Sequence, residues 1–413
     1  MQPVEKQDNS SVMMKEILFN NILPFWDKAV DRTNGGFYGK IDNHGTPDPL
    51  APKGLVQHAR FLWSYSALYR QFREEWFRER AQHAKEFLLN SFYNRETGGW
   101  NYLVDYRGQS IDNRNHIYAL SFVVYGFSEY ATAFDERESY QVSLKTYELI
   151  ERIARDRQYG GYHECFSSDF KKIEQIPEYG TVGFNKTMNT HIHLLEAYTT
   201  LTEASHSAAV KKSLCHLIDL ILDKILDKKR RTLHLFFTPD WTPLPSPISF
   251  GHDIELSWLL VEAAEAANYR LAEAENACLS LAKNTLNGLD LEKGGLFYEG
   301  DRQMLSDKDE ILRFAQDDRV AQNDRTTKVW WVQAEGLVGF LNAYQLSGDP
   351  RFLSAFESTK QWIMSHQMDH AHGEWFDKIF PDGSCGTEKG SVWKTLYHNS
   401  RACMKIMALE HVR

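Results

Sequence analysis

Hydrophobic and polar positions along the chain follow two helical patterns in alternation. Residues 75–94 place apolar side chains at three- and four-residue intervals with charges on the opposite face, which is typical of an amphipathic surface helix. Residues 250–268 are apolar nearly all round, which is typical of a buried helix. The sequence therefore predicts an outer and an inner set of helices.

Each pattern recurs six times. The outer helices are predicted near 11–30, 75–94, 137–156, 207–229, 269–288 and 350–367. The inner helices are predicted near 54–72, 114–134, 187–204, 250–268, 330–347 and 393–412. Links from an inner to the next outer helix are short, as at 345–350, so neighbouring helices are expected to run antiparallel.

A Gly-Gly-aromatic unit marks the loop from each outer helix to its inner helix. Clear copies are NGGFYG at 34–39, TGGWNY at 97–102, YGGYHE at 159–164 and KGGLFYE at 293–299, with degenerate copies at 231–237 and 372–378. Successive copies lie roughly 60 to 80 residues apart. The Asp, Asn, Gly and Pro residues that follow each copy favour turns, so each loop is predicted to hold a small β-hairpin.

These patterns predict an all-α fold, an (α/α)6 barrel of six helical hairpins. The short β-hairpins are expected in the loops on the active-site face, with 1–413 forming a single catalytic domain. Residues 305–328 are polar and charged and interrupt the repeat, so they are predicted to be a loop insertion near the cavity rim.

Composition and charge argue against several classes of function. The chain of 413 residues carries a net charge of −9 and no long basic run, which argues against nucleic-acid binding. No run of about 18 apolar residues and no signal-like N-terminus occurs, so we expect no membrane association and a cytoplasmic location. The five cysteines are scattered and form no C-x-x-C pair.

Polar and aromatic residues cluster where the predicted inner helices begin. Because buried polar groups are costly unless paired or functional, their recurrence on otherwise apolar helices indicates a site at one mouth of the barrel. These residues are Gln57, His58, Arg60, His116, Tyr118, Asn189, His191, His193, His252, Glu255, Trp330, Trp331, Glu335, Trp393, Tyr397 and His398.

Structural roles compete with functional ones at these positions. His58, His116 and His191 fit core or capping histidines equally well. A metal site at His193, His252 and His398 is the sharpest rival, but no H-E-x-x-H helix and no dense acidic cluster occurs. We therefore expect neither a metal nor a cofactor.

Histidine suits proton transfer near neutral pH because its ordinary pKa is about 6.5. Two histidines on opposite walls can remove a proton from one face of a carbon and return one to the other face. Arg60 and the positive N-termini of the inner helices would stabilise the enediolate that forms between these steps. Trp331 and Trp393 offer flat faces for sugar rings.

Four motifs carry a resemblance to a known family. MNTHIHLLEAY (188–198), FGHDIELSWLL (250–260), WWVQAEGLVGFLNAY (330–344) and YHNSRAC (397–403) resemble the N-acylglucosamine 2-epimerase superfamily, and within it the cellobiose 2-epimerases. The resemblance runs from about residue 15 to the C-terminus and implies an (α/α)6 barrel. It also implies an isomerase that interconverts glucose and mannose at the reducing end of β-1,4-linked disaccharides, through a cis-enediolate.

The resemblance assigns roles to individual residues. His252 and His398 would be the acid/base pair, and His193 would serve ring opening and hold O1. Arg60 would hold the enediolate oxygens, and Glu255 would orient and tune a histidine. The residues expected to bind substrate are Tyr118, Asn189, Trp331, Trp393, Glu335 and His116. The insertion at 305–328 is longer than expected for the family.

Several alternatives stay open at this point. A mannose 2-epimerase or an aldose–ketose isomerase of the same superfamily would share the histidines and the enediolate, whereas the motifs of acylglucosamine epimerases fit less well. A glycoside hydrolase needs two carboxylates that flank the bond, roughly 5 to 9.5 Å apart. A sugar-binding module would not need paired histidines. The partner expected is a disaccharide, and the chain is expected to be a monomer or weak homodimer.

Overall fold

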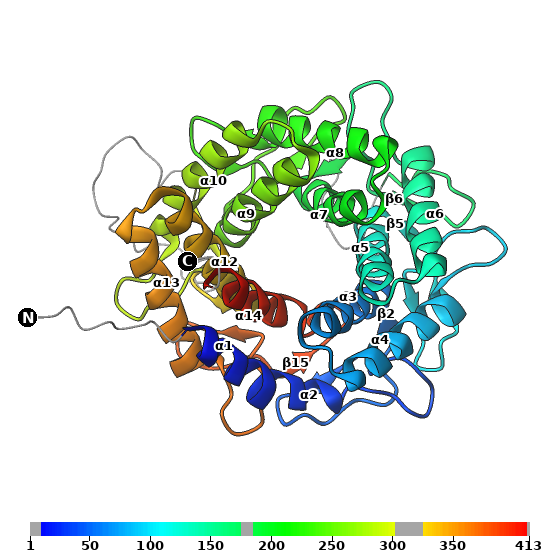
Figure 1. Ribbon diagram of the computed structural model, residues 1–413, viewed down its shortest axis with the longest axis horizontal. Coiled ribbons are helices and arrows are strands. Elements are labelled where there is room, and N and C mark those ends of the chain that lie inside the picture. Colours follow the sequence, from blue (N-terminus) through cyan, green and yellow to red (C-terminus); the bar gives the residue numbers. More distant parts are fainter. Residues whose placement is uncertain (1–9, 175–184, 302–324, 411–413) are drawn as a thin grey trace, which may run out of the picture.

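The structure of the protein is a computed structural model that describes residues 10–174, 185–301 and 325–410. Its inner helices form a ring inside an outer ring of helices (Figure 1). The inner helices are α3 (Leu55–Phe72), α5 (Ile117–Phe134), α7 (Met188–Ser205), α9 (Phe250–Ala267), α12 (Trp330–Ser347) and α14 (Tyr397–Glu410). This double ring is the predicted α/α barrel. The single domain over 1–413 stays a prediction.

The outer helices break their regular pattern near the C-terminal end. They are α1 (Ser10–Ile17) with α2 (Leu23–Asp27), α4 (Glu75–Phe87), α6 (Arg137–Ile153), α8 (Ala208–Leu220), α10 (Leu271–Thr285) and α13 (Pro350–Trp362). A π-helical turn separates α1 from α2 and also ends α4, α8 and α13. Such turns shift the helix register by one residue, a feature that hydrophobic periodicity does not reveal.

Short strands tie each unit to the next and close the ring. The strand before each inner helix pairs antiparallel with the loop of the following unit, and the last strand pairs with the first unit. The pairs are β2 (Lys53–Gly54) with β3 (Leu103–Val104), β5 (Asn115–His116) with β6 (Cys165–Phe166), β7 (Lys186–Thr187) with β10 (Phe236–Phe237), β11 (Ile248–Ser249) with β12 (Glu299–Gly300), β13 (Lys328–Val329) with β14 (Lys378–Ile379), and β15 (Glu388–Gly390) with β1 (Ile41–Asp42).

The hairpins predicted within single units are mostly isolated bridges. Examples are Val30 with Phe37 and Met368 with Trp375. Fuller pairing inside a unit occurs for β3 with β4 (Ser110–Asp112) and for β8 (Leu226–Asp227) with β9 (Thr232–Leu233). The strands therefore act chiefly between units, where they hold the loops of one barrel face together.

Buried lysines fasten the Gly-Gly turns. Lys53 pairs with Asp31 at 2.8 Å and donates to the Gly35 carbonyl at 2.7 Å. Gly36 has a φ of +65°, and a Cβ there would lie 2.6 Å from His58 Nε2, so only glycine fits this turn. Equivalent lysine–aspartate pairs recur in three further units, as Lys186–Asp156, Lys328–Asp290 and Lys389–Asp369.

Part of the polar cluster at the helix starts is structural. His58 Nε2 accepts the Phe37 backbone N–H at 3.0 Å, and His191 Nε2 accepts that of Tyr162 at 3.0 Å. Burial lowers the pKa of both histidines to about 3, so each stays neutral and can accept these bonds. In the fifth unit Gln333 replaces the histidine and accepts the Leu296 N–H at 2.8 Å. The core interpretation of His58 and His191 is confirmed.

The structure also bears on the predicted insertion and on the expected lack of a membrane-spanning helix. Lys328, assigned to the insertion at 305–328, belongs to the regular strand β13, whereas residues 305–324 lie outside the described residues. Within the described segments, no helix is both long and apolar enough to cross a membrane.

Candidate active site

A pocket of about 280 Å³ opens where the inner helices begin. Nine of the eleven predicted site residues line it, together with Tyr298 and Trp330. Each inner helix contributes from its first two turns, and Trp393 lies in the loop just before α14. The nine are Arg60, Tyr118, Asn189, His193, His252, Glu255, Trp331, Trp393 and His398.

His252 and His398 both pack against Trp331. Their ring centroids lie 4.8 Å and 5.8 Å from that of the tryptophan. The Nδ1 atom of His252 is hydrogen-bonded to Ser249 Oγ at 2.6 Å, and that of His398 to Glu335 Oε1 at 2.6 Å. With Nδ1 engaged in both rings, Nε2 is the nitrogen that can exchange a proton with a ligand.

Both histidines are neutral at neutral pH. Burial, helped by the nearby His193, lowers the pKa of His252 to about 3. Burial and the positive charges of Arg60 and Arg401 hold the pKa of His398 well below its usual value. Each ring therefore enters the reaction able to accept a proton.

A third histidine occupies the α7 wall. His193 Nδ1 is hydrogen-bonded to Glu196 Oε2 at 2.9 Å, and its ring lies edge-on to Tyr118 at 5.1 Å. Burial lowers the pKa of His193, and Glu196 opposes this shift only in part. Nearby, the Asn189 side-chain oxygen has no hydrogen-bond partner within the described part of the chain, so it is available to a sugar hydroxyl.

Arg60 is fixed before any ligand arrives. Its guanidinium donates to the Trp393 carbonyl at 2.7 Å and to the Tyr118 hydroxyl at 3.0 Å. It also lies 4.4 Å from the centroid of the Phe122 ring. These contacts hold a positive charge at the pocket wall.

Among the described residues, Glu255 has no hydrogen bond to a histidine, whereas the resemblance implied that it would orient one. It accepts a hydrogen bond from Arg401 at 3.0 Å, whereas Glu335 and Glu196 are the carboxylates bonded to His398 and His193. Burial and the adjacent Glu335 raise the pKa of Glu255 well above its usual value. This shift favours the neutral carboxylic acid form of Glu255.

Two residues predicted to bind substrate do not line the pocket. Glu335 lies beneath it, where it also accepts the Trp258 indole N–H at 3.1 Å. His116 is buried in β5 and stacks on Tyr102 at 5.3 Å. The sequence placed His116 on an inner helix beginning near residue 114, but it lies in strand β5, before α5 begins. The pairing of this strand directs the His116 side chain toward the loops.

Glu196 and Arg401 were not predicted as site residues. Glu196 follows His193 by three residues and Arg401 follows His398 by three, the same spacing as His252 and Glu255. Residues three apart lie on the same face of a helix, so this spacing was an available signal.

One group of side chains has metal-ligand character. Ligand atoms of Glu255, Glu335 and His398 lie within 4.8 Å of one another. Arg401 donates to both glutamates, at 3.0 Å and 2.8 Å, so its guanidinium already supplies the positive charge that a cation would bring. This arrangement fits a structural ion cluster better than a metal centre.

Comparison with known proteins gives the class of this enzyme. The model of the N-acylglucosamine 2-epimerase (GlcNAc 2-epimerase) family matches residues 36–402, and the chain belongs to this family. It is an epimerase, an enzyme of the isomerase class.

Two relatives and one solved structure show which members of the family the chain is similar to. The chain is 38% identical over 398 residues to a cellobiose 2-epimerase of Dictyoglomus turgidum, covering 95% of this chain and 96% of the relative. It is 36% identical to a cellobiose 2-epimerase of Bacteroides fragilis, with coverages of 95% and 97%. The structure of a cellobiose 2-epimerase from Spirochaeta thermophila matches with a TM-score of 0.88 and 35% identity, covering 99% of both chains.

Proposed function

We propose that this enzyme inverts C2 of the reducing-end glucose in β-1,4-linked disaccharides, converting cellobiose to glucosyl-mannose and lactose to epilactose. The observation that carries the proposal is the pair of neutral histidines, His252 and His398, in one pocket on the same tryptophan. The relatives named cellobiose 2-epimerase support the choice of a disaccharide.

The reaction begins with the open-chain sugar, whose formation His193 assists at O1. One of the two histidines takes the C2 proton through Nε2, and the C2–H electron pair forms the C1–C2 double bond of a cis-enediolate. Rotation about C2–C3 turns the other face of C2 toward the second histidine. This histidine takes up a proton from solvent at Nε2, favoured by the negative charge of the enediolate, and delivers it to C2 as the C1 carbonyl forms again. The first histidine releases its proton to solvent, so the enzyme returns to its starting state. The Glu335 carboxylate at His398 Nδ1 stabilises the imidazolium that forms when His398 is the base.

The developing negative charge meets fixed positive groups. Arg60 is held at the pocket wall by Tyr118 and the Trp393 carbonyl. The N-termini of the inner helices point toward the same pocket. Glu255, kept neutral by burial and by Glu335, can donate a hydrogen bond to an enediolate oxygen without repelling it.

Space for a second sugar lies beside the pocket. A groove of about 550 Å³ shares Tyr298, Trp330, Trp331 and Trp393 with the pocket. The pocket alone, at about 280 Å³, is small for a disaccharide when small-molecule sites are on the order of 300–1,000 Å³. We place the reacting sugar in the pocket and the second sugar in the aromatic groove.

Hydrolysis fits these side chains poorly. Among the described residues that line the pocket, Glu255 is the single carboxylate. A glycosidase needs two carboxyl groups on either side of the bond.

The test is incubation with cellobiose in deuterated water, followed by NMR. The proposal predicts a glucosyl-mannose product with deuterium at C2. Conversion of free mannose but not cellobiose would contradict the disaccharide assignment, and release of glucose would indicate hydrolysis.

Variants connect this activity to the pocket. His252→Asn and His398→Asn should each lower kcat by about 10²-fold or more, because each removes a proton-transfer group. His58→Gln is the matched control: it changes a buried histidine at a helix start that holds a hairpin, and it should stay active. An active His398→Asn variant would refute the acid/base assignment.

A further inference from the structure

Arg401 does not line the histidine pocket, and its charge is unexpected on a buried inner helix. It is a fully buried arginine in the middle of the barrel, on α14. Its guanidinium bonds three glutamates that come from three other inner helices, Glu196 on α7, Glu255 on α9 and Glu335 on α12. One cation thus joins four helices.

Two of these glutamates are the carboxylates that hold histidines. Glu335 is bonded to His398 Nδ1 at 2.6 Å, and Glu196 to His193 Nδ1 at 2.9 Å. Tyr397 also donates its hydroxyl to Glu196 at 2.5 Å. Both carboxylate–histidine pairs therefore share a single counterion.

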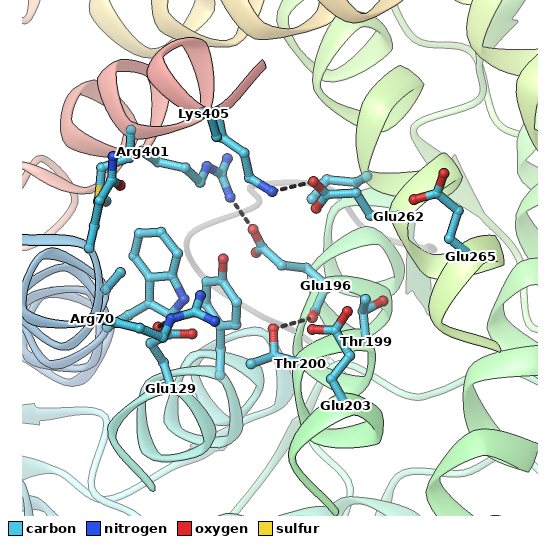
Figure 2. Close-up of a pocket in the computed structure, with 17 residues that line it drawn as sticks. Arg70, Glu129, Glu196, Thr199, Thr200, Glu203, Glu262, Glu265, Arg401 and Lys405 are labelled. Atoms are coloured by element: carbon cyan, nitrogen blue, oxygen red, sulfur yellow. Dashed lines mark hydrogen bonds and ion pairs between the residues drawn. The ribbon is translucent and has the colours of Figure 1, made fainter. Parts of the chain in front are cut away.

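The other side of Arg401 faces a second cavity. This cavity, of about 490 Å³, lies among the C-terminal halves of α3, α5, α7, α9 and α14, at the opposite end of the barrel from the histidine pocket. In Figure 2 Arg401 and Glu196 point toward each other, and Lys405 reaches Glu262 beside them. Arg401 and Glu196 line this cavity and bond residues of the pocket, so they belong to the layer between the two.

We infer that Arg401 is a positioning residue for the proposed epimerisation, which fixes the orientation of His398 and His193 through Glu335 and Glu196. An ionised carboxylate only accepts hydrogen bonds, so it selects the imidazole form that carries the proton on Nδ1 and presents Nε2 to the sugar. The guanidinium between these two buried carboxylates favours their ionised forms. Burial raises the pKa of Glu335, and the charge and hydrogen bond of Arg401 oppose that rise.

The ionisation of Glu196 agrees with this role. Although burial raises its pKa, the charge of Arg401 and the hydrogen bond from His193 lower it to about 2. Without Arg401, Glu196 and Glu335 would bind protons more readily, and a protonated carboxyl would donate to Nδ1 and reverse the tautomer.

The first measurement compares Arg401→Lys and Arg401→Gln with wild type. Lysine keeps the charge but cannot bond several carboxylates in a fixed fork, and we expect kcat to fall by about 10–10²-fold with KM within about threefold. In Arg401→Gln the acid limb of the kcat profile should move to higher pH, because the carboxylates need a higher pH to ionise. Lys405→Met is the matched control. It removes a cation of the same cavity, one turn along α14 and bonded to Glu262, and should keep kcat within about twofold.

The second measurement is ¹⁵N NMR of the imidazoles. Wild type should show His398 and His193 protonated on Nδ1, and Arg401→Gln should show the Nε2-protonated form. Guanidinium ion should partly restore kcat to Arg401→Ala by entering the second cavity. Unchanged tautomers and pH profile in a folded Arg401→Gln protein would overturn the inference, as would wild-type kcat in Arg401→Lys. Because NMR needs no turnover, a wild-type protein inactive on cellobiose would overturn the proposed function alone.

Discussion

Replacing Glu335 by glutamine tests how the protein prepares His398 for proton transfer. Glu335 accepts hydrogen bonds from His398 Nδ1 at 2.6 Å, Arg401 at 2.8 Å and Trp258 at 3.1 Å, and it does not line the pocket. The amide keeps the shape of the side chain but removes its negative charge. The imidazolium that forms when His398 takes the C2 proton then loses its charged partner.

The size of the effect follows from that single bond. Hydrogen bonds to charged groups contribute about 1.5–3 kcal/mol. Since about 1.4 kcal/mol of barrier is a factor of ten in rate, kcat should fall by about 10- to 150-fold. KM should change by less than about threefold, because Glu335 does not line the pocket.

The assay is the initial rate of deuterium incorporation at C2 of cellobiose, with KM measured in parallel. Glu262→Gln is the matched control, since it makes the same change on a glutamate that is bonded to Lys405, with 38% of its side chain exposed. Thermal unfolding of both variants shows whether the fold is kept. A folded Glu335→Gln enzyme with kcat within threefold of wild type would refute the assigned role of this carboxylate.

Three further predictions concern the scaffold and the second sugar. The free energy of unfolding in urea should fall as the pH drops from about 6.5 toward 3. In the unfolded chain the His58 imidazole binds a proton over this range, whereas burial keeps it neutral in the folded protein. His58→Gln should reduce this slope by up to about 1.4 kcal/mol per pH unit. The opposing effect of Glu164, whose pKa burial raises to about 7, is common to both proteins and cancels; an unchanged slope would contradict the prediction. Gly36→Ala should destabilise by about 1–3 kcal/mol more than Gly98→Ala in urea unfolding, since both have positive φ but only Gly36 has atoms within 4 Å of the added Cβ; equal losses would disprove the steric explanation. Trp393→Ala should raise KM for cellobiose by about 2- to 12-fold with little effect on kcat, because this residue, 43% exposed, lines the groove given to the second sugar; an unchanged KM would remove it from that site.

Much of the fold was predictable because it follows from the local periodicity of apolar residues. Inner helices that are apolar all round, outer helices with one apolar face and a Gly-Gly turn in each loop specify the alternation of the barrel. The site was predictable in outline for the same reason, since His252, Trp331 and His398 all lie in the first turn of an inner helix. No local pattern predicted the contact between Glu196 and Arg401, because these residues are 205 positions apart in the chain.

The sequence by itself determined which helices are buried and where along each helix the polar residues lie. It did not determine which way those residues face. His191 and His193 are two positions apart and therefore point about 200° apart around α7. Because α7 carries apolar residues on all sides, its sequence favours neither direction. Only packing against the loops and the neighbouring inner helices turned His191 to the Tyr162 hairpin and His193 to the pocket.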